Sequence, residues 1–149
     1  MNSNKVCIDA SLALTWLLAT QQDASADALW RHWHEKGIEM ICPAMFHAEV
    51  TSSIRKQVYF NLINNEEGEE AFSIYAGIPI KSLDSSEIYL RAWELAKELN
   101  LPRTYDMQYL AVAELNDCEL WTADKRLANS VQRKYKRVRW VGEFRSTKS

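Results

Sequence analysis

The chain has 149 residues, 47% of them hydrophobic and 26% charged, which is typical of one globular domain with a real core. No run comes near the roughly 20 apolar residues of a membrane-spanning helix. The polar residues 1–5 lead into a short apolar segment without a cleavage-site pattern, and three widely spaced cysteines fit a reduced protein. We therefore predict a single domain over residues 1–149, no membrane segment and a cytoplasmic location.

The net charge of −2 hides a strong asymmetry along the sequence. From residue 125 to the end there are nine Lys or Arg residues and one acidic residue, a balance of +8. The first 124 residues carry nine basic and nineteen acidic residues, a balance of −10. A basic end can follow a phosphate backbone, so Arg133, Lys134, Lys136 and Arg137 are candidate nucleic-acid-binding residues. A solvated basic surface explains the same pattern equally well.

Short apolar runs alternate along the chain with stretches that have helical spacing. In residues 23–36 apolar side chains recur every three or four positions, and Gly37 follows as a stop. Pro43 suits the first turn of a helix, because its missing N–H would have no partner there. The first half is predicted to hold a strand over 5–9, helices over 12–18 and 23–36, a strand over 38–42, and helices over 43–60 and 64–77.

The second half continues the alternation. Asp84 and Glu87 have the spacing of a capping box, which predicts the start of a helix. We predict an edge strand over 78–81, helices over 84–99 and 104–115, a strand over 119–122, a helix over 124–132 and a strand over 138–141. Such alternation favours an α/β fold with three α/β/α layers around a central, mostly parallel sheet. In such sheets, sites form outside the carboxyl ends of the strands.

Four acidic residues fall at or near those ends. Asp9 follows the apolar run of the first strand, and Asp124 follows the strand over 119–122 at the start of a helix. Glu49 lies early in the helix after the second strand. Asp106 shares a helical stripe with Leu110 and Ala113, at positions i, i+4 and i+7, so it is predicted to face inward.

Each acid also has a simpler explanation. An Asp before or within the first turn of a helix caps it or stabilises its dipole, and Glu49 is one of many helical glutamates. Together, however, four carboxylates at one end of a sheet would repel one another unless a cation neutralised them. Mg²⁺ and Mn²⁺ prefer such oxygen ligands and can activate water for attack on a phosphate. The combination predicts a metal site formed by Asp9, Glu49, Asp106 and Asp124.

These residues lie in segments that resemble the successive motifs of PIN domains, and most closely the VapC-like toxins of bacterial toxin–antitoxin pairs. The segments are residues 6–11 (VCIDAS), 48–50 (AEV), 105–113 (YDMQYLAVA) and 120–127 (LWTADKRL). The resemblance implies that the four acids bind Mg²⁺ or Mn²⁺ and cut RNA, leaving a 5′-phosphate. It also implies that Ser11 and Thr122 help to hold the acids or a water molecule, and that an antitoxin is a partner.

The tryptophans carry a second set of predictions. Trp93 and Trp121 lie in an amphipathic helix and a strand, which favours the core. Trp16, Leu17, Trp30 and Trp33 place more apolar surface in the first helical region than one small sheet needs to cover. They indicate either a partner groove or dimer contact, consistent with a homodimer, or simple core packing.

The sequence therefore predicts an endoribonuclease that depends on Mg²⁺ or Mn²⁺ and is the toxin of a toxin–antitoxin pair. One alternative is a nuclease or phosphatase that uses the same acids on DNA or small phosphate esters. Another is a non-catalytic module in which the acids are helix caps and the aromatic surface binds a protein. Loss of activity on chelation separates the metal-dependent hypotheses from the last one.

Overall fold

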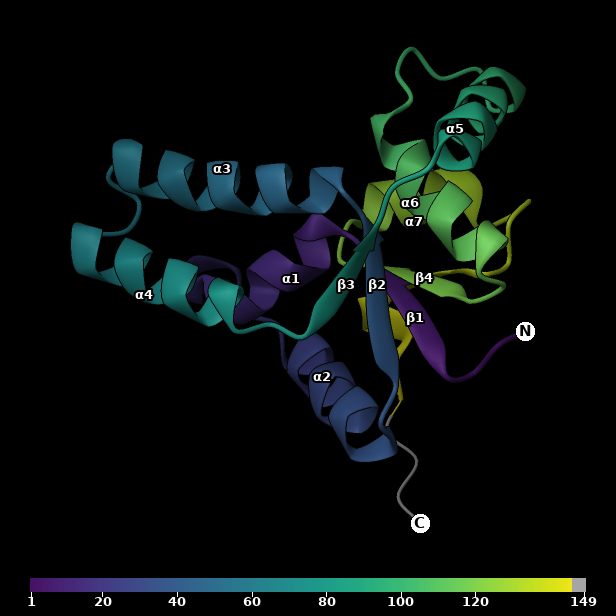
Figure 1. Ribbon diagram of the computed structural model, residues 1–149. Coiled ribbons are helices and arrows are strands. Elements are labelled where there is room, and N and C mark those ends of the chain that lie inside the picture. The colour runs from purple at the N-terminus through teal and green to yellow at the C-terminus, as the bar shows by residue number, and fades with distance from the viewer. Residues whose placement is uncertain (146–149) are drawn as a thin grey trace.

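The computed structural model describes residues 1–145. One sheet contains all five of their strands, in the order β3-β2-β1-β4-β5, and all neighbours are parallel (Figure 1). The strands are β1 (Lys5–Ile8), β2 (Glu39–Pro43), β3 (Ile80–Leu83), β4 (Glu119–Thr122) and β5 (Val138–Trp140). The predicted parallel sheet is confirmed, and its apolar strands are those of a sheet covered on both faces.

Helices cover both faces of the sheet. They are α1 (Ala10–Leu17), α2 (Ala24–Lys36), α3 (Met45–Tyr59), α4 (Asn65–Ala76), α5 (Ser86–Glu98), α6 (Tyr105–Leu115) and α7 (Lys125–Val131), with short 3-10 turns η1 (Ala19–Gln21) and η2 (Val141–Glu143). No helix within the described part of the chain is long and apolar enough to cross a membrane.

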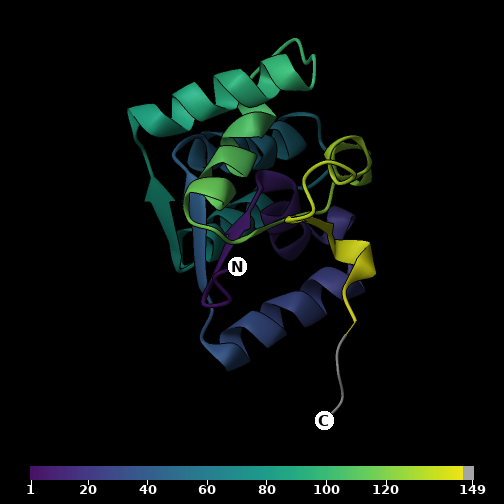
Figure 2. The same ribbon diagram turned by 90° about the vertical axis from the view of Figure 1, so that its right-hand side faces the viewer.

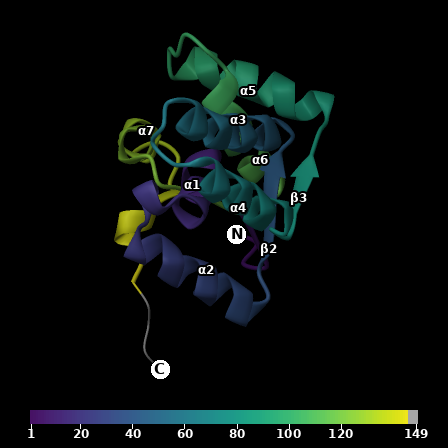
Figure 3. The same ribbon diagram turned by 90° about the vertical axis from the view of Figure 1, so that its left-hand side faces the viewer.

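The helices form two separate layers. On one face, α6 packs on β1, β2 and β4, α7 packs on β4 and β5, and α5 packs on α6. On the other face, α1 contacts β4 and is covered by α2, α3 and α4. Figure 2 shows α5 and α6 on the side opposite to α2, and Figure 3 shows the α3–α4 hairpin outside α1. The three predicted layers are therefore present.

The core explains why α6 lacks a polar face. All residues from 109 to 113 are buried, because this helix lies between the sheet and α5. A helix enclosed on both sides is hydrophobic all round. In α5 the buried face consists of Ile88, Ala92 and Leu95, so Trp93 points outward and is 58% exposed. The prediction that Trp93 belongs to the core was wrong, whereas Trp121 is confirmed as a core residue at 5% exposure.

The predicted capping box at the start of α5 differs from the structure. Ser85 is the N-cap of α5 and its side chain makes no capping hydrogen bond, while Asp84 accepts one from the Tyr89 hydroxyl. The reciprocal capping box opens α4 instead, where Asn64 and Glu67 each accept the other's backbone N–H. A competing donor can thus capture an acid that has capping-box spacing.

The turn after β2 also differs from the prediction. Pro43 is the last residue of β2, and α3 begins two residues later at Met45. Pro43 is therefore not in the first turn of the helix as predicted. Its lack of an N–H fits the end of a strand as well as the start of a helix.

Candidate active site

The candidate site lies at the carboxyl edge of the sheet. Asp9 directly follows β1 and Thr122 ends β4, and these two strands are parallel neighbours in the register Ile8 to Trp121. The chain builds outward from β1 to β2 and β3 on one side, and to β4 and β5 on the other. The gap between β1 and β4 is therefore the topological switch point, where parallel α/β sheets form their sites.

Asp9 is the most firmly held of the predicted acids. It is 5% exposed. Its Oδ1 accepts the Ser11 hydroxyl at 2.7 Å and the Leu12 backbone N–H at 3.0 Å, and its Oδ2 accepts the Thr122 hydroxyl at 2.5 Å. Asp9 is thus also the N-cap of α1, so the simpler explanation holds as well. Both of its oxygens are fixed in place.

Ser11 and Thr122 connect Asp9 to the turn after β4. The Ser11 Oγ accepts the Ala123 N–H at 3.1 Å, and the Thr122 Oγ1 accepts the Asp124 N–H at 2.9 Å. Because each hydroxyl accepts from this turn, its single proton is free to be donated to Asp9. The two predicted supporting residues therefore hold β1 and the start of α7 in one arrangement.

The surroundings of Asp9 disfavour its charge. Burial raises the pKa of its carboxyl from 3.8 to about 6, although the hydrogen bonds from Thr122 and Ser11 lower it. The negative charge of Asp106 raises this pKa further. A buried carboxylate next to another acid is the arrangement that a bound cation would relieve.

Glu49 reaches the same edge from α3. It is half-buried, and its Oε1 accepts the hydroxyl of Tyr109 at 2.5 Å. Burial raises the pKa of Glu49, the Tyr109 hydrogen bond lowers it and Asp106 raises it. Sequence reasoning missed Tyr109, which is 2% exposed. The signal was a phenol three residues after Asp106, within a helical segment that is otherwise almost wholly apolar.

Asp106 and Asp124 lie at the outer side of the site. Both side chains are exposed, so the prediction that Asp106 faces inward was wrong, although Leu110 and Ala113 on its stripe are buried. Asp106 stands in the first turn of α6. Protein around its carboxyl still raises its pKa, and the charge of Asp124 adds to the rise. Asp124 caps α7 by accepting the backbone N–H groups of Arg126 and Leu127.

The four acids share one edge and are uncompensated. None of them takes part in an ion pair within residues 1–145. Asp106 influences the pKa of both Asp9 and Glu49, and Asp124 influences that of Asp106. No three His, Cys, Asp or Glu side chains of the described residues form a ready metal-binding group. The acids are thus gathered at one edge but not at one point, and their all-oxygen donors suit a hard divalent ion.

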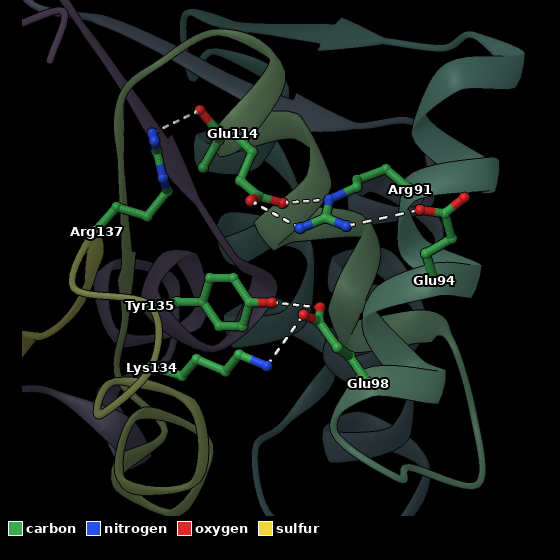
Figure 4. Close-up of polar contacts among 8 residues, drawn as sticks. Arg91, Glu94, Glu98, Glu114, Lys134, Tyr135 and Arg137 are labelled. Atoms are coloured by element: carbon green, nitrogen blue, oxygen red, sulfur yellow. Dashed lines mark hydrogen bonds and ion pairs between the residues drawn. The ribbon is translucent and has the colours of Figure 1, made fainter.

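The predicted RNA-binding residues lie elsewhere. Lys136 and Arg137 precede β5 and are therefore at the amino edge of the parallel sheet, opposite the acids. Arg137 donates to the carbonyls of Cys118 at 2.9 Å and Ala113 at 3.3 Å. Lys134 pairs with Glu98 at 3.0 Å (Figure 4).

Other basic residues near the end of the chain are exposed or lie outside the described residues. Arg133 and Lys136 are exposed, and Lys148 lies outside the described residues. Part of the basic end therefore has a structural role, and Lys136 and Arg137 are not beside the acids. Contact of Arg133 and Lys134 with RNA stays a prediction, whereas the amino-edge position of Lys136 and Arg137 leads us to expect no RNA contact there.

The predicted partner-binding residues divide into two pairs. Leu17 and Trp33 are 7% and 5% exposed, so they belong to the core. Trp16 and Trp30 are half-buried and pack edge to face at 4.6 Å between ring centres. They line a pocket of about 480 Å³, together with Asp27, Arg31, Ser73, Ile74, Gly77 and Ile78. Only this second pair can offer aromatic surface to a partner without repacking.

The fold and the site together define a parallel α/β domain with an acidic edge at the switch point of its sheet. A family model described as PIN domain matches residues 6–131, a range that includes all four acids. The chain belongs to the PIN domain family, as its motifs predicted.

Individual relatives agree with this placement. The VapC ribonuclease Mb0985 of Mycobacterium bovis is 27% identical over 127 residues, which cover 85% of this chain and 91% of the relative. A solved toxin–antitoxin complex from Klebsiella pneumoniae superimposes with a TM-score of 0.67 at 18% identity, over 93% of this chain and 99% of that one. The structure of VapBC2 from Rickettsia felis, bound to a promoter DNA fragment, gives 0.65 at 12% identity, over 91% and 96%. These two structures show the fold alone.

Proposed function

We propose that this protein is a VapC-like ribonuclease toxin that hydrolyses RNA phosphodiester bonds with Mg²⁺ or Mn²⁺ held by Asp9, Glu49, Asp106 and Asp124. The observation that carries the proposal is the group of four acids at one sheet edge, none of them ion-paired within the described residues. Membership of the PIN family and a curated relative named as a ribonuclease support RNA as the substrate.

The four acids divide the work by their burial. Asp9 is buried and has both oxygens fixed by hydrogen bonds, so it provides an anchor whose position does not change. Glu49 is oriented by the Tyr109 hydroxyl. Asp106 and Asp124 are exposed, so in this proposal they face the approaching RNA. A divalent ion bound here would activate water and neutralise charge on the phosphate.

The rival functions make different use of the same edge. A phosphatase or deoxyribonuclease would need the same acids, and a binding module would need only their capping role at α1 and α7. For Asp106, in the first turn of α6, the binding module would likewise need only its interaction with the helix dipole. The relative's name favours RNA over the other phosphodiesters.

The test compares substrates and acids in one assay. Purified protein should cleave single-stranded RNA with Mg²⁺ or Mn²⁺, stop with EDTA, and leave single-stranded DNA and p-nitrophenyl phosphate intact. Asp106→Asn should lower the cleavage rate by about 100-fold or more. Glu98→Gln, which changes an acid of α5 paired with Lys134, should cleave like the parent. Equal cleavage with and without chelator would contradict the metal-dependent proposal. Cleavage of DNA but not of RNA would mean that DNA is the substrate.

An antitoxin is the proposed partner, and the pocket between Trp16 and Trp30 is its proposed anchor site. Both structural neighbours above are toxin–antitoxin assemblies, which supports a partner of this kind. Large aromatic side chains usually contribute most to such interfaces. A pocket with Asp27 and Arg31 on its wall suits an apolar side chain flanked by polar groups.

Co-expression with the neighbouring reading frame tests the partner site. Trp30→Ala should weaken copurification of the antitoxin without lowering RNA cleavage. Trp93→Ala is the control, because it removes a solvent-accessible tryptophan from a different helix, α5. If the antitoxin copurifies equally strongly with Trp30→Ala and Trp93→Ala, its binding groove lies elsewhere. The oligomeric state of the free protein, predicted to be a dimer, is measured by analytical ultracentrifugation.

A further inference from the structure

We propose that Tyr105, Arg103 and Arg126 form the RNA-binding rim of the acidic edge, with the Tyr105 ring stacking on a base and the two arginines contacting phosphates. This inference rests on the proposed function and deepens it, because it names the side chains that position the RNA. The three residues flank Asp106 and Asp124, the two exposed acids of the site.

Tyr105 is an aromatic side chain exposed beside a site acid. It is the first residue of α6, directly precedes Asp106 and is 59% exposed. No hydrogen bond or aromatic contact of its side chain is found in the described part of the chain. A ring left free next to a site for phosphate chemistry is suited to stacking on an unpaired base, since every base has a π-face.

Its position distinguishes Tyr105 from the other exposed aromatic residues. Those lie on α3, α4 and α5 or directly after α3, and are Tyr59, Phe60, Phe72, Tyr89 and Trp93. The first two pack on each other at 5.0 Å beyond the far end of α3, Phe72 packs on Tyr75, and Tyr89 donates to Asp84. Among residues 1–145, Tyr105 is the exposed aromatic residue next to one of the four acids.

Two cations stand next to the same two acids. Arg103 precedes Asp106 by three residues, and Arg126 follows Asp124 by two. Both are exposed, and neither guanidinium makes a hydrogen bond or ion pair with another described residue. By contrast, Arg91, Arg137 and Arg139 are all engaged with acids or carbonyls. An acidic edge repels a polyanion, so uncommitted cations beside it are what RNA binding requires.

The starts of α6 and α7 are close enough for one substrate to contact both. Asp106 and Asp124 lie at those starts, and the charge of Asp124 adds to the raised pKa of Asp106. Both helices also pack on the same strand, β4. A single strand lying across the two exposed acids would therefore meet Tyr105 and Arg103 on one side and Arg126 on the other.

Binding of a fluorescein-labelled single-stranded RNA of mixed sequence tests the ring. The measurement uses fluorescence anisotropy in an Asp9→Asn background, which prevents cleavage. Tyr105→Ala should weaken binding by between about 5-fold and about 150-fold, the range for loss of one stacked base. Tyr105→Phe keeps the ring and should bind within about 2-fold of the parent. Trp93→Ala, the exposed aromatic control on α5, should bind like the parent.

The salt dependence of the same binding tests the two arginines. Removing one cation that neutralises a phosphate of a single strand lowers the slope of log K against log salt by about 0.7. Arg103→Gln with Arg126→Gln should therefore lower the slope by about 1.4. Lys136→Gln, an exposed cation before β5 at the opposite edge, should leave the slope unchanged.

The outcomes separate this inference from the proposed function. If the parent neither binds nor cleaves RNA, the proposed function fails and this inference fails with it. If the parent cleaves RNA but Tyr105→Ala binds like the parent, the stacking inference alone is overturned. The same holds if Tyr105→Phe loses as much as Tyr105→Ala, because the hydroxyl rather than the ring would then be responsible. If the double arginine variant has the same salt slope as the parent, the proposed phosphate contacts of Arg103 and Arg126 are overturned.

Discussion

Acidic residues have opposite surroundings at the carboxyl edge of the sheet and on one flank of the molecule. At the carboxyl edge, Asp9 and Glu49 have raised pKa values, mainly because of burial. On the flank formed by α5, α6 and the segment before β5, acids are paired with cations. Arg91 meets Glu114 through two hydrogen bonds of 2.8 and 3.1 Å, and Lys134 pairs with Glu98 at 3.0 Å (Figure 4).

This difference separates structural charge from functional charge. On the flank, Glu98 has a lowered pKa because Tyr135 and Lys134 donate to it. There the opposite charges neutralise each other and link α5 to α6 and to the segment before β5. At the carboxyl edge the protein keeps negative charge without a partner among the described residues, which costs stability and marks a functional site. Each prediction below breaks or sharpens this contrast.

The largest effect is expected from neutralising acids of the carboxyl edge. Asp9→Asn and Asp106→Asn keep the side-chain shape but remove the charge. Each should lower RNA cleavage by between about 100-fold and about 1,000-fold, the usual cost of removing one electrostatic contact to a transition state. Initial rates with Mn²⁺ measure this effect. The same change on the flank, Glu114→Gln, should leave the rate unchanged, and an equal loss there would dissolve the contrast.

Asp9 should also make stability depend on pH in metal-free buffer. Its pKa rises from 3.8 to about 6 on folding, so the folded state holds its proton more tightly. Below about pH 4 Asp9 is protonated in both the folded and the unfolded state, so it does not change the free energy of unfolding. As the pH rises from about 4 to about 6, its ionisation destabilises the folded state by up to about 3 kcal/mol. Urea unfolding in EDTA at pH 4 and pH 7 measures it.

The Asp9→Asn variant supplies the reference for this measurement. It should be more stable than the parent at pH 7 and similar to it at pH 4. Comparison within the pair cancels the contributions of Glu98 and Glu143, whose lowered pKa values give stability that is lost at low pH. If the parent and Asp9→Asn differ in stability by the same amount at both pH values, burial does not raise the pKa of Asp9.

A smaller effect is expected from the phenol behind Glu49. Tyr109→Phe removes the hydroxyl that orients Glu49 but keeps the buried ring. It should weaken Mn²⁺ binding by about 10-fold, as is usual when a metal ligand loses the hydrogen bond that orients it. Isothermal titration calorimetry measures the affinity without any RNA. Tyr89→Phe is the control, because its hydroxyl donates to Asp84 away from the site. Equal Mn²⁺ affinity in both variants would leave Tyr109 a purely structural role.

The sequence predicts well whatever depends on local patterns. The buried run Val6, Cys7 and Ile8 is a strand, and an acid after it must lie at the carboxyl end. The parallel arrangement then brings Asp9 and Asp124 to one edge whatever the order of the strands. Capping, the competing explanation for both residues, is also correct, since a helix that starts at this edge uses the same carboxylate.

What failed depends on neighbours that are distant in the sequence. Helical spacing shows that α5 has an apolar stripe but not which stripe faces α6, so the sequence misplaces Trp93. The basic end looks like one surface in the sequence. The position of β5 beside β4 instead puts Arg137 at the amino edge. Tyr109 gains its role only when its hydroxyl on α6 reaches Glu49 of α3 at the carboxyl edge of the sheet.

The smallest effect is expected at that amino edge. Arg137 donates to the Cys118 and Ala113 carbonyls and to Asp117, so it joins the end of α6 to the start of β4. Arg137→Gln should lower the free energy of unfolding by about 1 kcal/mol, the net value of a typical hydrogen bond, while RNA binding stays unchanged. Lys136→Gln removes an equal charge from an exposed neighbour and should change neither quantity. Urea unfolding and RNA anisotropy on the same samples measure both. If Arg137→Gln instead weakens RNA binding and leaves stability intact, the basic end belongs to the RNA surface, and the amino edge is functional after all.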